Sequence, residues 1–187
     1  MNLEKILKKI ESEKPEIGIG TAAATAGILA ASLVIKVASK SGLKEVEKDA
    51  YIIKNELKNL IKEDSKAYKE YIKAYKSKDK QKIKEALNYI IETPIGIAEQ
   101  SYKIILLAEA ALKQGKKSMV LEAYGAAKIG RAAVESAAEI ADFNLKELKY
   151  KKYRIQLEKY VSYIRSQAEE IEKRANAEAY VYKNENT

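Results

Sequence analysis

Hydrophobic residues recur every three to four positions along most of the chain, a spacing typical of amphipathic α-helices. The pattern predicts seven helices, over residues 3–13, 20–39, 43–77, 80–91, 95–113, 118–143 and 145–180. We expect Thr93-Pro94 to end the fourth helix, because proline disfavours helical backbone at the residue before it. Gly115 is placed to cap the fifth helix. The pattern contains no alternation of the kind that indicates β-strands.

The turn residues support the same fold class. The 187 residues include 8 Gly and 2 Pro, too few for a chain rich in strands and loops. We therefore predict an all-α fold, a bundle of long antiparallel helices. We expect residues 1–187 to form one domain, with a frayed tail at about residues 181–187.

One segment, residues 17–35, holds 19 residues without a charge, which is long enough to cross a membrane. A Lys-containing start followed by an apolar run also resembles a signal peptide. However, six of these residues are Ala, three are Gly and three are Thr or Ser, and such side chains favour membrane insertion weakly. Small residues at helical spacing allow close helix packing; here they are Gly20, Ala24, Gly27 and Ala31. We favour a buried central helix, with no membrane partner.

Composition limits the chemistry. The chain has no Cys and no His, which excludes a thiolate nucleophile, a sulfur-ligated zinc ion and a histidine base. Proton transfer must use Asp, Glu, Lys or Tyr, and we expect no metal. The net charge is +8, but Lys alternates with Glu and Asp without a basic block, so we expect no nucleic-acid partner. Abundant Lys without Cys is also typical of thermophile proteins.

Asp64 interrupts an otherwise uncharged stripe on the helix over residues 43–77. The stripe follows heptad spacing and consists of Val46, Ala50, Ile53, Leu57, Leu60, Asp64, Ala67, Tyr71 and Ala74. A carboxylate on a core-facing stripe needs a partner, and burial raises its pKa towards values useful for acid–base catalysis. Asp64 is thus a candidate catalytic residue, or else a structural residue bonded to a helix end or a Lys.

Similar polar interruptions occur in the helix over residues 118–143. Its stripe consists of Met119, Glu122, Ala126, Ile129, Ala133, Ser136, Ile140 and Phe143. Glu122 is a second candidate acid, although a first-turn Glu is also favoured by the helix dipole. Asn144 lies between two helical patterns, where it can serve as an N-cap. Gly18-Ile19-Gly20-Thr21 is a glycine turn into a helix N-terminus, whose N–H groups can hold an anion or a carbonyl oxygen.

Four segments in this order carry a resemblance to a known family: GIGT at 18–21, EDSKAYKEYIKAYK at 63–76, ETPIGIAEQ at 92–100 and the stretch from Gly115 to Leu148. Over roughly residues 3–175 the chain resembles the cyclodeaminase/cyclohydrolase family, which includes the C-terminal domain of formiminotransferase-cyclodeaminase. The resemblance implies an all-helical homodimer that processes one-carbon units on tetrahydrofolate.

The resemblance also assigns residues. It places the family's acidic residue on Asp64 and its substrate-binding positions on Gly18, Gly20, Thr21, Ser39 and Asn144. The chain departs from the family pattern at four positions. Lys116 and Ile140 stand where the family has Asn, and Leu121-Glu122 stands where it has Ser-Asp.

The implied activity is a cytoplasmic enzyme of one-carbon metabolism that acts on a reduced folate or an archaeal pterin. It would hydrolyse methenyl-tetrahydrofolate or cyclise formimino-tetrahydrofolate with release of ammonia. Asp64 is the expected acid–base residue and Glu122 the second choice. The pterin is the expected small-molecule partner, without further cofactor or metal. The alternative is a non-catalytic pterin-binding or structural homodimer of the same fold.

Overall fold

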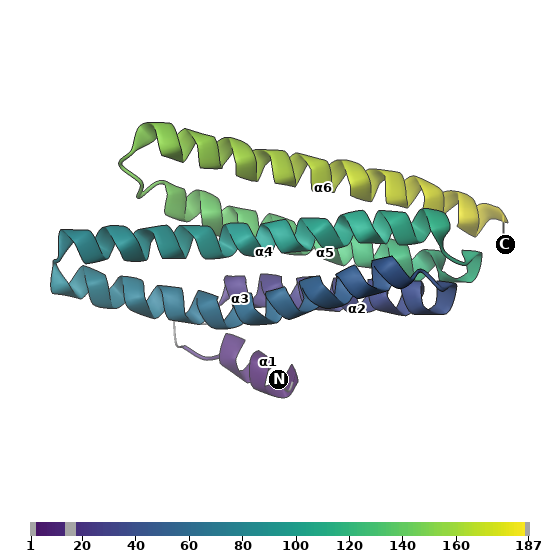
Figure 1. Cartoon of the computed structure of the whole chain (residues 1–187), viewed down its shortest axis with the longest axis horizontal. Helices are drawn as coiled ribbons and strands as arrows, with labels where there is room; N and C mark the ends of the chain where they lie inside the picture. Colours follow the sequence, from purple (N-terminus) through teal and green to yellow (C-terminus); the bar gives the residue numbers. More distant parts are fainter. Residues whose placement is uncertain (1–2, 14–17, 186–187) are drawn as a thin grey trace.

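Helices account for nearly all of the computed structural model, which describes residues 3–13 and 18–185. These residues form α1 (Leu3–Ile10), α2 (Ile19–Ser41), α3 (Lys44–Ser77), α4 (Lys80–Gln114), the 3-10 turn η1 (Lys117–Met119), α5 (Val120–Leu145) and α6 (Lys151–Glu185), with no strand in the described ranges (Figure 1). The structure thus confirms the all-α prediction and the bundle of long helices.

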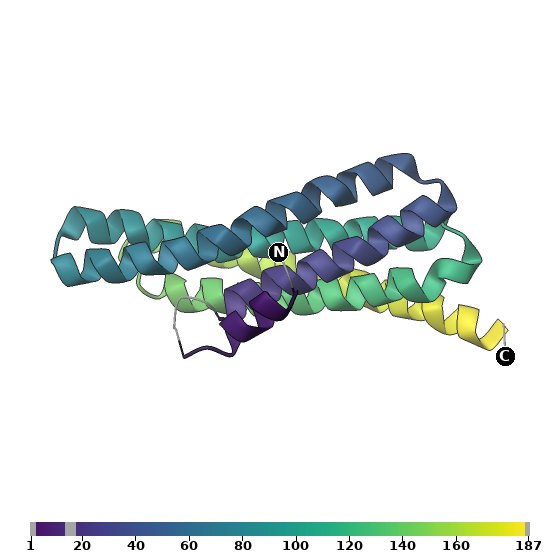
Figure 2. The same cartoon turned by 90° about the horizontal axis from the view of Figure 1, so that it is seen from below.

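The five long helices lie along the long axis of the molecule, and α1 lies against one side near α2 (Figures 1 and 2). α3 and α4 form a long hairpin, and α5 and α6 form a second one. α4 contacts α2, α3, α5 and α6, whereas α2 packs on α3, α4 and α5. α4 therefore lies at the centre of the bundle, and one side of α2 is buried against three helices.

Small side chains allow α2 to approach its neighbours closely. Gly20, Ala24, Gly27 and Ala31, the predicted small-residue face, are all buried. A Cβ atom at Gly27 would lie 2.8 Å from Ser101 Oγ and 2.9 Å from Leu57 Cδ1, so a larger residue there would force these two side chains to shift. α2 is long and apolar enough to cross a membrane, and no other helix in the described ranges is. Its packing on three helices explains that composition, in agreement with the predicted core helix.

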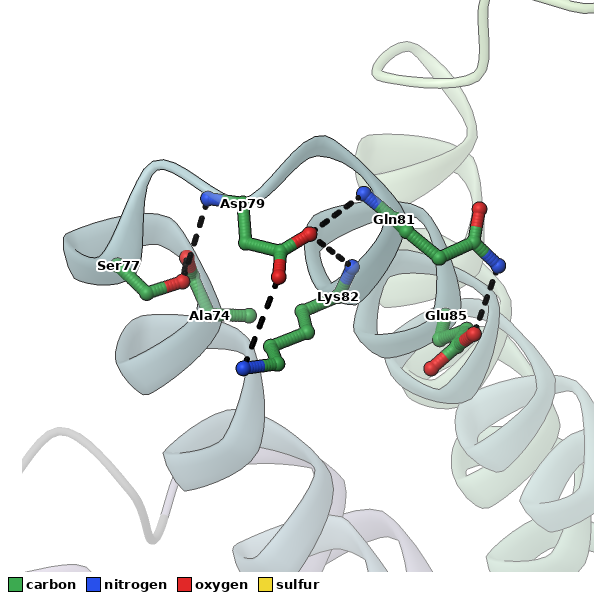
Figure 3. A network of polar contacts seen from close by, with 6 residues as sticks. All are labelled: Ala74, Ser77, Asp79, Gln81, Lys82 and Glu85. Atoms are coloured by element: carbon green, nitrogen blue, oxygen red, sulfur yellow. Dashed lines mark hydrogen bonds and ion pairs between the residues drawn. The ribbon is translucent and has the colours of Figure 1, made fainter.

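The turn between α3 and α4 is fixed by short-range hydrogen bonds (Figure 3). α3 ends at Ser77, and Lys78 adopts a left-handed conformation with φ 58°. Asp79 then caps α4, because its Oδ1 accepts hydrogen bonds from the backbone N–H groups of Gln81 (3.0 Å) and Lys82 (3.2 Å). These bonds, first that from Lys82, lower the pKa of the Asp79 carboxyl. Residues of the turn itself therefore determine where α3 ends and where α4 begins.

The predicted helix break at Thr93-Pro94 is wrong, because α4 runs through Pro94 without interruption. Proline lacks an N–H group, so the carbonyl of Ile90 loses its donor within the helix. Asn144 in the last turn of α5 replaces that donor: its Nδ2 donates to the Ile90 carbonyl at 2.7 Å. Asn144 is therefore not an N-cap, and a contact from another helix makes the proline tolerable inside α4.

The buried face of α5 also differs from the predicted stripe. The stripe included Phe143, whose side chain is 70% exposed. The buried face consists of small residues and a few larger ones: Ala123, Ala126, Ala127, Gly130, Ala133, Val134, Ala137, Ala138, Ala141 and Leu145. A Cβ at Gly130 would lie 2.8 Å from Ile105 Cγ1. α5 thus turns its smallest side chains towards α2 and α4, because it packs closely on both.

A double-mutant cycle tests the coupling of Asn144 to Pro94. Asn144→Ala leaves the Ile90 carbonyl without a donor, so we expect the free energy of unfolding to fall by about 1–3 kcal/mol. In the Pro94→Ala background the new N–H at position 94 can bond to Ile90, so the same change should cost much less. Chemical denaturation of the four proteins measures both costs. Equal costs in the two backgrounds would contradict the coupling.

Candidate functional site

A cavity of about 430 Å³ opens beside the N-terminus of α2. Four helices contribute to its wall: α2 by its first turn, α3 by its middle, α4 by the turn before Pro94, and α5 by its last turns. The residues that line it are Gly18, Ile19, Gly20, Asp64, Ala67, Tyr68, Tyr71, Ile72, Ile90, Thr93, Ile140, Phe143 and Asn144. Among these lining residues Asp64 is the one with a charged side chain, and most of the others are apolar or aromatic.

Asp64 reaches from α3 to the first turn of α2. Its Oδ2 accepts a hydrogen bond of 3.3 Å from Thr21 Oγ1, and the backbone N–H of Thr21 also donates to the carboxylate. Burial raises the pKa of the Asp64 carboxyl, while the hydrogen bonds from Thr21 oppose that rise. The positive end of the α2 dipole also favours the ionised form. Asp64 therefore has a helix end as its partner, and its pKa is shifted towards values suited to proton transfer.

Gly20 provides the space for this carboxylate. A Cβ atom on Gly20 would overlap both carboxylate oxygens and would lie 2.7 Å from Cγ of Asp64. At Gly18, by contrast, an added Cβ would meet nothing within 4 Å. α2 begins here, with Gly18 at the N-cap and its carbonyl accepting from the Ala22 N–H at 3.1 Å. The glycine turn thus serves two purposes: Gly20 admits Asp64, and Gly18 opens towards the cavity.

Five of the predicted site residues lie together. Gly18, Gly20, Asp64 and Asn144 line the cavity, and Thr21 is buried behind it as the partner of Asp64. The Asn144 side-chain nitrogen is engaged by Ile90, whose carbonyl can only accept. This fixes the amide orientation and leaves the side-chain oxygen as the free acceptor of Asn144.

Ser39 and Glu122 lie elsewhere in the chain's fold. Ser39 is exposed in the last turn of α2. Glu122, in the first turn of α5, forms an ion pair of 2.9 Å with Lys36, and this contact lowers the pKa of its carboxyl. Lys36 follows Gly20 by 16 residues, or about 24 Å along α2. A single chain therefore does not bring Ser39 or Glu122 to the Asp64 cavity.

The departures from the family pattern divide in the same way. Ile140 lines the Asp64 cavity, where it adds apolar surface. Lys116 and Leu121 flank η1 at the end of the bundle where α2 finishes, and the Lys116 N–H donates to Ser41 Oγ at 2.9 Å. Three of the four departures, Lys116, Leu121 and Glu122, are thus remote from Asp64.

Sequence reasoning did not single out the aromatic wall of the cavity. Tyr68 and Tyr71 follow Asp64 by four and seven residues, so helical periodicity puts them on the same face of α3. Phe143 and Asn144 follow Ile140 by three and four residues on α5 in the same way. This spacing is the sequence signal that places these residues on the same helix faces as Asp64 and Ile140. The contributions of Ile90 and Thr93 depended on the continuity of α4 through Pro94.

The cavity combines one carboxylate with apolar and aromatic walls. Such a site suits a flat heterocycle that is neutral or cationic, because the rings offer stacking surface and the carboxylate stabilises adjacent positive charge. Within residues 3–13 and 18–185, no three His, Cys, Asp or Glu side chains are grouped so that they could hold a metal ion.

Comparison with known proteins agrees with this fold. The structure is similar to the crystal structure of a formiminotetrahydrofolate cyclodeaminase from Thermotoga maritima, with a TM-score of 0.91 at 19% sequence identity, covering 95% of each chain. No curated protein sequence matches the chain. The family model described as formiminotransferase-cyclodeaminase matches residues 2–163, most of the sequence. The chain therefore belongs to the formiminotransferase-cyclodeaminase family, whose members point to an enzyme of folate one-carbon metabolism.

Proposed function

We propose that this protein binds a reduced folate or a related pterin in the Asp64 cavity and catalyses a reaction at its one-carbon group. The observation that carries the proposal is the Asp64 carboxylate, held at the N-terminus of α2 in a largely apolar cavity. The family supports the substrate class, and the Thermotoga relative is named for formiminotetrahydrofolate. The cytoplasmic location and the lack of a metal or further cofactor belong to the same proposal.

Two reactions fit this site. In the first, water attacks the cationic methenyl carbon and loses a proton to Asp64. One C–N bond of the five-membered ring then breaks as its nitrogen takes that proton back, and the hydroxyl group loses its own proton to solvent and becomes a formyl group. In the second, the neighbouring arylamine nitrogen, which lies outside the pterin ring, attacks the formimino carbon. Its proton passes through Asp64 to the amino group of the formimino unit, and ammonia leaves. In both, the carboxylate accepts and returns a proton and stabilises a cationic centre. A raised pKa suits that exchange near neutral pH.

We further propose a homodimer that forms through the outer face of α2 and α5. Leu29 on α2 and Leu121 on α5 are 51% and 46% exposed, so this face carries apolar side chains that association would bury. The two helices pack on each other, so their outer sides form a common surface. An antiparallel pairing of two such surfaces would bring the Ser39 and Glu122 end of one subunit towards the Asp64 cavity of the other.

Asp64→Asn is the direct test of catalysis. The variant keeps the shape but loses the proton acceptor, so we expect the rate of methenyl-pterin decay, or of methenyl formation from formimino-pterin, to fall by about two to four orders of magnitude. Absorbance of the methenyl chromophore measures both. The control is Glu63→Gln, which removes the preceding, exposed carboxylate and should retain the wild-type rate.

The stability of the same variant has a defined pH dependence. Because burial raises the pKa of Asp64 in the folded state, the ionised carboxylate destabilises the fold near pH 7, and the Asp64→Asn variant should have an equal or higher Tm there. This advantage should shrink as the pH falls and Asp64 takes up its proton. A large loss of Tm with unchanged turnover would make Asp64 structural. If neither protein turns over any methenyl or formimino pterin, the non-catalytic binding alternative replaces the enzyme proposal.

Two glycine substitutions test where the ligand binds. In Gly20→Ala the new methyl group collides with the Asp64 carboxylate and must displace it. We expect pterin affinity to fall at least about tenfold, as for a lost hydrogen bond to a charged group. Gly125→Ala adds the same methyl group outside the cavity, at an ordinary van der Waals distance of 3.8 Å from Leu33 Cδ1, and should have a much smaller effect. Titration calorimetry compares the two, and equal affinities would place the ligand elsewhere.

Lysine substitutions at the proposed dimer surface test whether the dimer forms there. Wild-type protein should elute as a dimer in chromatography calibrated by light scattering. The double variant Leu29→Lys/Leu121→Lys should elute as a folded monomer, because four buried ammonium groups would oppose association. The control Leu106→Lys changes a leucine of similar exposure on α4 and should leave the dimer intact. A wild-type monomer would refute the proposed interface.

A further inference from the structure

The positive charge of the protein is concentrated at one end of the bundle, where the α3–α4 turn and the α5–α6 connection come together (Figure 1). We call this region, residues 66–85 and 146–154, the basic end. It contains 13 Lys and Arg residues and 4 Asp and Glu residues, whereas the rest of the sequence contains 22 and 23. The net charge of +8 therefore comes entirely from the basic end.

The fold gathers this charge from two segments that are separated by 60 residues in the sequence. Along the chain, acidic residues interrupt the lysines and no basic block forms, which is why the sequence alone predicts no nucleic-acid partner. In the structure, all 12 lysines of the basic end have exposed side chains. The folded chain therefore offers an anionic macromolecule a surface that the order of residues does not reveal.

Helix stability does not explain why lysines lie here. The first turn of a helix favours acidic side chains, because the helix dipole is positive there. α3 and α5 begin at the other end of the bundle and carry glutamates in their first turns. α4 begins at the basic end with Lys80 and Lys82 beside its Asp79 cap, and its first turn has no acidic residue. α6 also begins there, with Lys151 and Lys152 and again no acid in the first turn. The charge thus lies where the dipole disfavours it, which indicates a binding role.

The lysines surround the tip of the α3–α4 hairpin and do not form one flat patch. A row of lysines follows one side of α3 for about 15 Å, because its members are three or four residues apart. They are Lys66, Lys69, Lys73 and Lys76. On α4, Lys82 lines the groove beside this row, whereas Lys80 and Lys84 lie on the side that faces the α5–α6 connection. A membrane surface would contact one of these sides, but a flexible chain of phosphates can follow both.

Exposed aromatic rings lie among these lysines. Tyr75 and Tyr150 are 65% and 68% exposed, and Tyr153 is exposed as well. Phe143, in the last turns of α5, is also exposed, and the Lys146 ammonium lies 5.9 Å from the centre of its ring. Such rings stack on the bases of a single strand, because those bases are not paired with another strand. Lysines and tyrosines together match the two components of a single strand, its phosphates and its bases.

We propose that the basic end binds a single-stranded nucleic acid. Phosphates of the strand pair with lysines on both sides of the α3–α4 tip, and bases stack on Tyr75 and Tyr150. Binding of the strand requires neither a pterin nor proton transfer by Asp64, so it is a second function of the chain at a separate surface.

Fluorescence anisotropy of a labelled oligo(U) of about 20 nucleotides, longer than the site of one binding domain, measures this binding on the full chain. Oligo(dT) of equal length is the second probe, and the lower Kd of the two identifies RNA or DNA as the strand. The variant Lys73→Gln/Lys76→Gln/Lys152→Gln should raise the Kd at least about tenfold, because three phosphate contacts are lost. For the wild type, log Kd should rise linearly with the logarithm of the salt concentration, as counterion release requires.

A second triple variant serves as the control. Lys40→Gln/Lys44→Gln/Lys117→Gln removes the same charge from exposed lysines outside the basic end and should raise the Kd much less. Because both variants lower the net charge equally, a difference between them locates the binding at the basic end. Equal losses in the two variants, or no binding of either oligonucleotide at about 50 mM salt, would overturn the inference.

Tyrosine substitutions test the stacking. Tyr75→Ala/Tyr150→Ala keeps every lysine and should still raise the Kd at least about tenfold, as for the loss of two stacked bases. The control Tyr51→Ala/Tyr180→Ala removes two tyrosines that are 49% and 65% exposed on other parts of the surface, and it should bind like the wild type. Equal Kd values for the two tyrosine variants would contradict a surface that binds bases.

Anionic vesicles and a duplex distinguish other occupants of the basic end. Vesicles of phosphatidylcholine and phosphatidylserine present negative charge on a surface, and a duplex of the same length as the oligonucleotides is stiff, with its bases paired. Both should bind more weakly than the single strand, since neither follows both sides of the tip with unpaired bases. Tighter binding of either would assign the basic end to a lipid surface or to a duplex and overturn the inference.

Discussion

The bundle depends on the close approach of α2 to α3, α4 and α5, which small side chains alone permit. At Gly27 the space that a side chain would occupy is filled by Leu57 and Ser101. At Gly20, two turns earlier on the same face, the corresponding space is filled by the carboxylate of Asp64. The same packing requirement therefore builds the core in the middle of α2 and admits a charged group at its end.

This arrangement explains how a carboxylate is tolerated on a core-facing stripe. Leu57 and Asp64 are seven residues apart on α3, so they lie on one face and contact α2 at successive positions. In the middle of α2, where the backbone groups are bonded within the helix, α3 packs against it with Leu57. At the start of α2, where the N–H groups have no partner within the helix, α3 provides the carboxylate of Asp64 as an acceptor. The match between the two helices thus changes from apolar to polar at the point where the cavity opens.

The cavity is braced by two polar contacts between helices, one on each side. Thr21 to Asp64 joins α2 to α3, and Asn144 to Ile90 joins α5 to α4. In each, a side chain satisfies a group that the helix itself cannot satisfy: an N-terminal donor in α2 and the carbonyl released by Pro94 in α4. A second cavity, which shares Tyr71 with the first, is lined by Lys80, Lys84, Lys149 and Glu147, whereas Asp64 is the charged side chain in the lining of the first.

The sequence by itself determined the features that depend on periodicity within one segment. Residues three to four positions apart indicate the helical class, the small-residue face of α2, the glycine turn at its start and the place of Asp64 on a core-facing stripe. Tertiary structure alone decided the rest. Pro94 remains inside α4 because its missing donor is replaced from α5, about fifty residues later in the sequence. The true buried face of α5 is its alanine face, because α5 packs closely on two helices, and hydrophobicity alone does not reveal that requirement. Ser39 and Glu122 lie a helix length away from Asp64 because α2 is straight and its two ends cannot meet. The second cavity is formed by α3, α4 and the connection from α5 to α6, and no local sequence pattern specifies that these segments meet.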